Sequence, residues 1–196
     1  MTRKIDDFLA HHQTFLSRTA RNYGLSSSML QTALDEGMIV REEPGVYVLA
    51  GAETDQYSLL SQKFTPGIFS QETALILHGL TTEMPLHFYM TFPQGYNNHN
   101  LAKWDVTARH LVHNRYAVGI TTIQSPSGDP IKVYDKERTL LDVWADSTIG
   151  PNVKYEAVET YLCGQLSVED DLRLAAYARD LYPTTELITL MEVLAR

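Results

Sequence analysis

A cluster of hydroxyl and amide side chains near the N-terminus could form hydrogen bonds to another molecule. It comprises Ser26, Ser27, Ser28, Gln31 and Thr32. Short hydroxyls at a helix N-terminus can contact phosphates beside the free backbone N–H groups, and a glutamine amide can bind an adenine edge through two hydrogen bonds. These residue types favour contact with DNA, and the alternative is a solvated helix face with a good N-cap.

Basic side chains lie on both sides of this cluster in the sequence. Arg18, Arg21 and Arg41 could each neutralise a DNA phosphate. Three further basic residues lie in a β-rich part of the chain: Lys103, Arg109 and Arg115. They could extend the phosphate contacts, or they could be scattered solvated charges. We therefore include all of these basic residues among the candidate DNA-binding residues.

Three short helices are expected to position the N-terminal candidates. Apolar residues at helical spacing predict a first helix over residues 5–12 and a second one that Thr14 caps and Gly24 ends. Ser26 then caps a third helix, and Gly37 ends it. The polar cluster forms the outward face of this third helix.

Two short strands follow, MIVR and VYVL, joined by the turn EEPG. Three helices followed by a hairpin are the order of a winged helix-turn-helix, in which the third helix enters the major groove. We therefore predict a DNA-binding domain over residues 1–50. Glu42 and Glu43 lie at the tip of the wing, where DNA contact favours basic residues, so we expect the wing to be held away from phosphate.

A polar stretch over residues 51–55 indicates the start of a second domain, residues 51–196. Ser70 caps a helix that Gly79 ends, β-rich segments follow, and Asp135 caps the helix KERTLLDVW. The end of the chain has the pattern of three packed helices with these apolar faces: Val153, Ala157 and Tyr161; Leu172, Ala175 and Ala176; Leu187, Ile188, Met191 and Leu194. The predicted fold class is α+β, a winged helix-turn-helix followed by a mixed α/β domain that ends in a helical segment.

Charge and composition limit the function classes. The formal net charge is −8, and residues 146–196 carry nine acidic and four basic side chains, which disfavours a DNA site there. No apolar run is long enough to span a membrane, and acidic residues stand where a signal peptide would be apolar, so we expect a cytoplasmic protein without a membrane partner. The single Cys163 excludes an internal disulfide and a thiolate zinc cluster, and we expect it to be buried.

The residue patterns disfavour an enzyme. A nucleotidyltransferase would need two aspartates one residue apart after a Gly-Ser turn, and the chain has no D-x-D. Asp129 stands three residues before Lys132, as in a restriction-type nuclease, but the spaced acidic partner is missing and a turn explains the segment better. His110 and His113 have no carboxylate at metal-ligand spacing. We expect no catalytic site, no metal and no other cofactor.

Several segments together resemble a known family. They are SQETALILHGL, then YMTFPQGYN after Pro85, then IKVYDKERTLLDVWAD, with Gly45-Val46-Tyr47 ending the hairpin before them. Over most of residues 14–146 the chain resembles the AbiEi-type antitoxins of bacterial abortive-infection systems.

The resemblance implies a two-domain antitoxin. Its winged helix would bind operator DNA and repress the operon, and its second domain would counter a nucleotidyltransferase-like toxin without a stable complex. The recognition helix would be Ser26 to Glu36. The signature of the second domain would comprise Ala74, Leu75, His78, Gly79, Asp135, Arg138, Thr139 and Asp142. The acidic wing tip departs from the basic wing expected of the family.

Structural roles are the alternative for most of this signature, and we favour them. Arg138 and Asp142 are four residues apart on a helix and can pair, while Asp135 is a helix cap and Gly79 a C-cap. His78, just before Gly79, is more typical of a packed or capping histidine than of a catalyst.

Partners follow from these expectations. Winged-helix regulators commonly bind inverted repeats with two copies, yet no dimerisation element stands out, so we expect a monomer that binds DNA cooperatively. The alternative functions are an interaction scaffold, in which the acidic C-terminal helices dock a basic partner or a second copy, and a metal-dependent nuclease-like enzyme.

Overall fold

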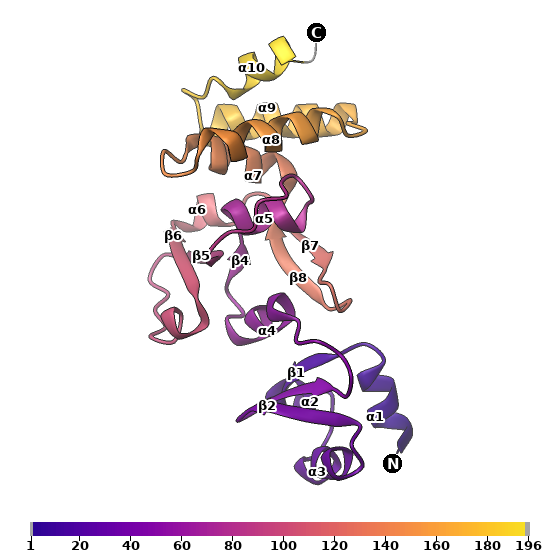
Figure 1. Cartoon of the computed structure of the whole chain (residues 1–196). Helices are drawn as coiled ribbons and strands as arrows, with labels where there is room; N and C mark the ends of the chain where they lie inside the picture. Colours follow the sequence, from indigo (N-terminus) through magenta and orange to yellow (C-terminus); the bar gives the residue numbers. More distant parts are fainter. Residues whose placement is uncertain (1, 195–196) are drawn as a thin grey trace. The chain divides into compact units, whose positions relative to one another are not determined.

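The computed structural model describes residues 2–194, with side chains from residue 4 onward. Contacts divide the chain into two compact units. The N-terminal unit comprises the chain up to Thr65 together with Thr122–Ile131, and the second unit comprises Pro66–Thr121 and the chain from Lys132 onward. Within residues 2–194 the fold is mixed α+β, with ten α-helices and two sheets, which confirms the predicted class at this level (Figure 1).

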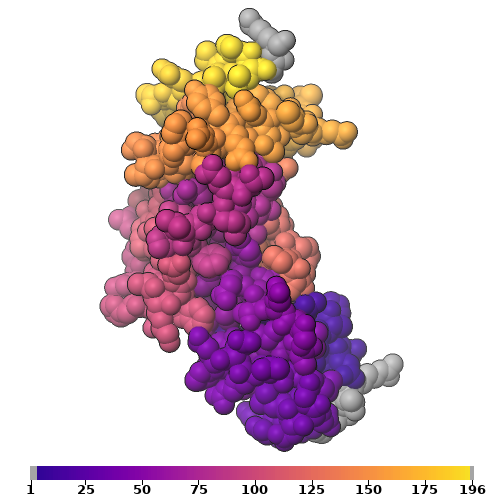
Figure 2. Space-filling model, viewed as in Figure 1, coloured from indigo at the N-terminus to yellow at the C-terminus, as the bar shows by residue number. Residues whose placement is uncertain are grey.

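The N-terminal unit consists of short helices around a small antiparallel sheet. Its elements are α1 (Thr2–Leu9), β1 (Thr14–Leu16), α2 (Ser17–Asn22), α3 (Ser27–Asp35), β2 (Ile39–Glu43), β3 (Val46–Leu49) and α4 (Gln56–Lys63). The strand order in the sheet is β1-β3-β2. Phe8, Ala20, Leu25, Leu30 and Ile39 are buried in its core, so each of the first three helices is anchored by an apolar side chain. Figure 2 shows these segments as one continuous indigo-to-purple surface.

The second helix begins later than predicted, because Thr14–Leu16 forms strand β1. This strand pairs antiparallel with β3, and the ring of Phe15 stacks on that of Tyr47 with 5.7 Å between centroids. Helix α2 starts at Ser17. The first helix ends at Leu9, so His12 lies outside it. The strand depends on a partner later in the chain, which local sequence spacing does not reveal.

The ends of α2 and α3 follow their local signals. The Ser26 hydroxyl accepts a hydrogen bond from the Met29 N–H at 3.2 Å and caps α3, as predicted. Gly24 (φ +84°) and Gly37 (φ +68°) adopt the left-handed conformation that ends a helix. A Cβ at Gly24 would lie 2.6 Å from Nζ of Lys4. Because that ammonium is the end of a flexible side chain and can move, the left-handed backbone conformation is what requires glycine at this turn.

The second unit contains most of a five-stranded mixed sheet and the helices around it. The elements of this unit and of its sheet are β4 (Ile68–Phe69), α5 (Gln71–Leu77), β5 (Phe88–Pro93), the 3₁₀ helix η1 (Ala102–Trp104), β6 (Val106–Leu111), α6 (His113–Tyr116), β7 (Ile120–Gln124), β8 (Pro130–Tyr134), α7 (Lys136–Ala145), α8 (Pro151–Leu162), α9 (Val168–Leu181) and α10 (Leu187–Leu194), and the facing ends of β7 and β8 belong to the N-terminal unit. The strand order is β6-β5-β4-β8-β7. Strand β4 pairs antiparallel with β5 and parallel with β8, and β5 pairs parallel with β6.

Helices α7 to α10 share one apolar core, and α8 to α10 are the orange-to-yellow segments in Figure 2. The predicted face of α8 and the buried Leu187 and Met191 of α10 are confirmed. The predicted face of α9 was wrong, because Leu172 is 66% exposed and the buried positions are Leu174 and Ala178.

Cys163 is exposed, so its predicted burial was also wrong. None of the described helices combines the length and the apolar character that crossing a membrane requires.

The β7–β8 hairpin connects the two units along the chain. Its tip, Thr122–Ile131, belongs to the N-terminal unit, as does helix α4. The compact units therefore do not coincide with a boundary at residue 50. The functional division into residues 1–50 and 51–196 stays a prediction.

Candidate functional site

Helix α3 presents a polar face to solvent. The exposed side chains on this face are Ser27, Ser28, Gln31, Thr32 and Asp35. On the opposite side, Leu30 is 4% exposed and Ala33 is 1% exposed, both within the core of the N-terminal unit. The face is therefore carried by a helix that is fixed from behind by packing and at its start by the Ser26 cap.

Hydrogen bonds order several side chains of this face. The hydroxyls of Ser26 and Ser28 lie 2.8 Å apart, and the Thr32 hydroxyl donates to the backbone oxygen of Ser28 at 3.0 Å. One turn further along, Nε2 of Gln31 donates to Oδ1 of Asp35 at 2.9 Å. The Gln31 amide and the Asp35 carboxylate thus form one paired polar group on the exposed surface.

The basic residues of the N-terminal unit differ in their attachments. The Arg18 guanidinium donates to the backbone oxygen of Gln62 in α4, so it is held by a protein partner. Arg21 is exposed, and its Nε donates to the Ser17 oxygen at a long 3.4 Å. Arg41 is exposed in strand β2, opposite Tyr47 of β3. Arg21 and Arg41 therefore remain the more available of the three predicted phosphate ligands.

Lys4 is a basic residue that the sequence analysis missed. Its Nζ donates to the backbone oxygen of Gly24 at 3.0 Å, at the turn between α2 and α3. A lysine ammonium has three donors, so further donors remain for a phosphate near this turn. The local sequence offers no signal for this contact, because it depends on how α1 packs against the turn.

The three basic candidates of the second unit have local roles. Arg109 donates to Asp142 at 3.0 Å, and Arg115 donates to the backbone oxygen of Leu181 at 2.8 Å. Lys103 is exposed in η1, with its Nζ 6.0 Å from the Trp104 ring centroid. Because both arginines already bind partners within the second unit, we expect neither of them to extend the phosphate contacts.

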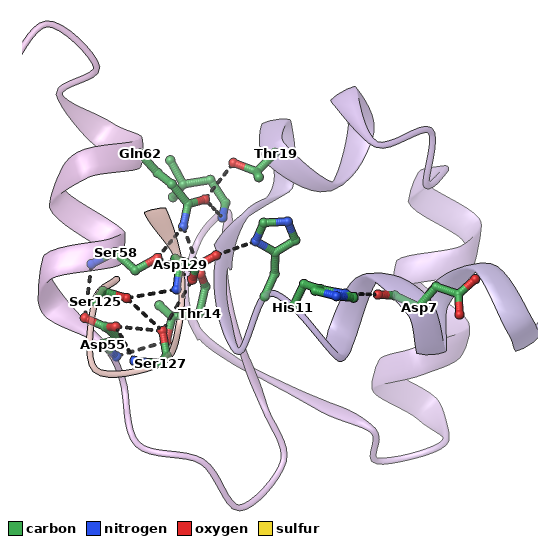
Figure 3. A network of polar contacts seen from close by, with 12 residues as sticks. Asp7, His11, Thr14, Thr19, Asp55, Ser58, Gln62, Ser125, Ser127 and Asp129 are labelled. Atoms are coloured by element: carbon green, nitrogen blue, oxygen red, sulfur yellow. Dashed lines mark hydrogen bonds and ion pairs between the residues drawn. The ribbon is translucent and has the colours of Figure 1, made fainter. Parts of the chain in front are cut away.

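A buried polar network lies within the N-terminal unit (Figure 3). Asp129, in the hairpin tip, is 4% exposed, and its carboxylate accepts from the Ser58 hydroxyl at 2.7 Å and lies 2.5 Å from Nδ1 of His12. Lys132, three residues later, is exposed in β8. Gly128 has φ +88°, as expected of the turn. The burial and the partners of Asp129 fit a structural role better than nuclease chemistry.

Asp55 is the second buried carboxylate of this network. It caps α4 by accepting from the Ser58 N–H at 3.0 Å, and it accepts from the N–H and hydroxyl of Ser127 at 2.9 and 2.6 Å. Burial alone would raise the pKa of Asp55, but hydrogen bonds from Ser125, Ser127 and Ser58 bring it below the ordinary value of 3.8. The hairpin tip is therefore attached to α4 through an ionised carboxylate at neutral pH.

The signature residues of the second unit meet where β8 joins α7. The Asp135 carboxylate caps α7 by accepting from the Arg138 N–H at 2.8 Å, which confirms the predicted cap. The Thr139 hydroxyl and Nε2 of His78 both donate to the backbone oxygen of Tyr134, at 3.2 and 2.7 Å. Burial lowers the pKa of His78, so its neutral form is favoured. These contacts hold the strand–helix junction together.

A buried ion pair follows one turn further along α7. Nε of Arg138 lies 3.0 Å from Oδ2 of Asp142, and both side chains are fully buried. Arg109 pairs with the other carboxylate oxygen at 3.0 Å, the Tyr182 hydroxyl donates to it, and the Arg138 guanidinium lies 4.9 Å from the Tyr134 ring centroid. The predicted pairing of Arg138 with Asp142 is confirmed, and its burial supports the structural role.

Beside this pair lies an open pocket of about 400 Å³. Its polar walls include Arg109 and Asp142, and also Gln71, whose amide donates to Asp146 at 2.7 Å. The polar groups of the walls are thus paired with one another.

Among the described residues, no three His, Cys, Asp or Glu side chains gather in a metal-binding arrangement, and Nε2 of His110 is hydrogen-bonded with the Tyr96 oxygen at 3.0 Å.

Comparison with known proteins supports the fold only. No family model matches the chain, and no curated protein matches it either. The chain is similar to the crystal structure of the RV2827C protein from Mycobacterium tuberculosis, with a TM-score of 0.52 and 13% sequence identity, over 91% of this chain and 71% of that one. At this identity the likeness shows a shared fold and carries no activity with it.

Proposed function

We propose that the chain is an antitoxin that represses its own operon by binding operator DNA through the N-terminal unit. The observation that carries the proposal is the exposed polar face of α3, on a helix fixed by the Ser26 cap and by the core behind it. The order α1, β1, α2, α3, β2, β3 with the sheet order β1-β3-β2 supports a winged helix-turn-helix, in which α3 enters the major groove.

The chemistry of the N-terminal unit suits this role. Gln31 can bind an adenine edge through its amide, and the hydroxyls of Ser27 and Ser28 lie at the start of α3, where free N–H groups favour phosphate. Arg21 and Arg41 supply positive charge for flanking phosphates. The exposed Glu42 and Glu43 repel phosphate, so the tip of the β2–β3 hairpin stays clear of the DNA, while Arg41 lies further back along β2.

The toxin-directed half of the proposal rests on the resemblance to AbiEi-type antitoxins. Its signature residues Asp135, Arg138 and Asp142 hold the second unit together, so they support the domain that counters a nucleotidyltransferase-like toxin without touching the toxin. The protein works in the cytoplasm as a monomer that binds inverted repeats cooperatively. Co-expression with a nucleotidyltransferase-like toxin tests this half by growth rescue, and repression is read from a promoter reporter in the same cells.

The DNA-binding half is tested by the salt dependence of duplex binding. For the full chain, log Kd against log salt should be steep, and Arg21→Ala and Arg41→Ala should each flatten the slope by about 0.9 units, because each removes one phosphate contact. Arg18→Ala should flatten it less, because its guanidinium is bound to Gln62. The matched control is Arg179→Ala, which removes an exposed charge paired with Asp180 in α9. Equal slopes for the wild type, Arg21→Ala and Arg41→Ala would refute the interface.

A protein-docking module is the second candidate, and one observation favours it. Val168 and Leu172 lie one turn apart on α9 and are 75% and 66% exposed, next to the acidic Glu169 and Asp171. Such a patch suits a basic partner with an apolar contact. Co-purification of one partner that survives high salt, together with absent DNA binding, would favour this candidate over the repressor.

A further inference from the structure

The exposed pair formed by Gln31 and Asp35 has free hydrogen-bonding capacity of both kinds. Nε2 of Gln31 uses one N–H on Oδ1 of Asp35, at 2.9 Å. Its second N–H and its Oε1 remain, and so does Oδ2 of the carboxylate. Thr32, beside them, already donates its hydroxyl proton to the Ser28 oxygen. The pair is therefore the part of this face best equipped to distinguish hydrogen-bond donors from acceptors.

We propose that Asp35 determines sequence specificity, by orienting the Gln31 amide toward adenine and by accepting a hydrogen bond from the amino group of cytosine on the neighbouring base pair. The inference rests on the proposed DNA binding and adds a base preference to it. Asp35 also acts as a positioning residue, because its carboxylate fixes which side of the Gln31 amide faces outward.

The chemistry of the base edges supports this assignment. In the major groove adenine offers N7 as an acceptor and its amino group as a donor, which match the remaining N–H and the oxygen of Gln31. Cytosine offers its N4 amino group, to which carboxylates bind. Guanine and thymine present only acceptors there, and a carboxylate oxygen repels them. A half-site read by the pair therefore contains an adenine next to a cytosine.

The negative charge of Asp35 should lower affinity while it raises selectivity. A carboxylate close to the phosphates weakens binding to every sequence, and its repulsion is strongest where no amino group meets it. Asp35→Asn removes that charge and presents an amide, which binds adenine. A carboxylate that contacts no base would also lower the affinity for random DNA, but its removal would leave the base preference unchanged.

The experiment is selection from a random duplex library with the full chain, followed by binding to the enriched duplex and its single-base variants. The wild type should enrich adenine next to cytosine. Asp35→Asn should bind random DNA several-fold more tightly, lose on the order of tenfold discrimination at the cytosine position, and shift toward adenine there. Asp35→Ala should also weaken the adenine preference, because the Gln31 amide is no longer held.

Glu42→Gln is the matched control, since Glu42 is an exposed acidic residue of the same unit at the hairpin tip, outside the recognition helix. It should raise affinity for all sequences and leave the enriched bases unchanged. Steep salt-dependent binding with the same base preference in wild type and Asp35→Asn would overturn this inference and leave the proposed function standing. No salt-dependent binding by the wild-type chain would overturn both.

Discussion

In the N-terminal unit the buried carboxylates of Asp55 and Asp129 are held by hydroxyls, N–H groups and one histidine, whereas in the second unit the buried carboxylate of Asp142 is held by two arginines and the Tyr182 hydroxyl. In the first arrangement, hydrogen bonds from small polar groups stabilise the negative charge, and the hydroxyls among these groups can rotate. The second neutralises it with large side chains whose own charge also needs a partner. The two units should therefore respond differently when a carboxylate is removed.

The difference also explains what the signature of the second unit does. Removing one partner of a buried ion pair leaves an uncompensated charge, so Arg138 and Asp142 constrain each other. Together with the Asp135 cap and the bonds to the Tyr134 oxygen they fix the β8–α7 junction. Under the proposed antitoxin function, the toxin-directed surface lies on other, exposed side chains of this unit.

Asp142→Ala should have the largest effect on stability. It leaves the fully buried Arg138 guanidinium without its carboxylate, which should lower the free energy of unfolding by about 3–5 kcal/mol. Urea-induced unfolding measures this loss. Arg138→Met combined with Asp142→Leu should recover much of it, because neither charge is then buried alone. A loss below about 1 kcal/mol for Asp142→Ala would mean that the pair is not closed to solvent and that the contrast between the units is false.

Asp129→Ala should have a smaller effect, of about 1–3 kcal/mol on the free energy of unfolding. It removes the acceptor that the Ser58 hydroxyl and the ring of His12 contact, whereas the Ser127 hydroxyl keeps its shorter bond to Asp55, and neither Ser58 nor His12 needs a negative charge nearby to stay in place. Thermal unfolding of the full chain measures it, with Glu53→Ala, an exposed acidic residue of the same unit, as the control. A loss as large as that of Asp142→Ala would remove the distinction between the two clusters.

Local signals in the sequence predicted the parts of the fold that depend on neighbouring residues. The caps Ser26 and Asp135 and the turn at Gly24 need only a few adjacent residues, and all three were found. Strand β1 was missed because Phe15 belongs to a strand only when Tyr47 lies beside it. The face of α9 was misplaced because apolar residues occur on more than one side of that helix, so periodicity alone did not fix its rotation.

The candidate sites show the same limit. The spacing of Arg138 and Asp142 on helix α7 predicted their pairing. It did not predict their burial or the third partner, Arg109, which lies on strand β6. Asp129 was recognised as part of a turn, while its contact with His12 joins residues from opposite ends of the N-terminal unit's sequence. Spacing predicts contacts within one element, and packing decides the rest.

The smallest effects concern pH, and here the two units should show opposite signs. The pKa of Asp55 lies below 3.8, so its carboxylate stabilises the fold above about pH 4, and this contribution is lost as the pH falls through the lower folded value. Burial raises the pKa of Asp135 above 3.8 despite hydrogen bonds from the Arg138 N–H and Tyr177. Its charge therefore opposes folding at neutral pH, and that cost disappears as the pH falls through its raised value toward 3.8.

Asp55→Asn should accordingly lower the free energy of unfolding by about 1 kcal/mol at pH 7, with the loss shrinking below about pH 4. Asp135→Asn keeps an oxygen to cap α7 and should be neutral or stabilising at pH 7, with any gain vanishing as the pH falls. Urea unfolding of both variants and the wild type from pH 3 to pH 7 measures the two trends. Parallel pH profiles would contradict the contrast. They would show that the hydrogen bonds from the hairpin tip do not favour the ionised form of Asp55 any more than the surroundings of Asp135 favour the ionised form of Asp135.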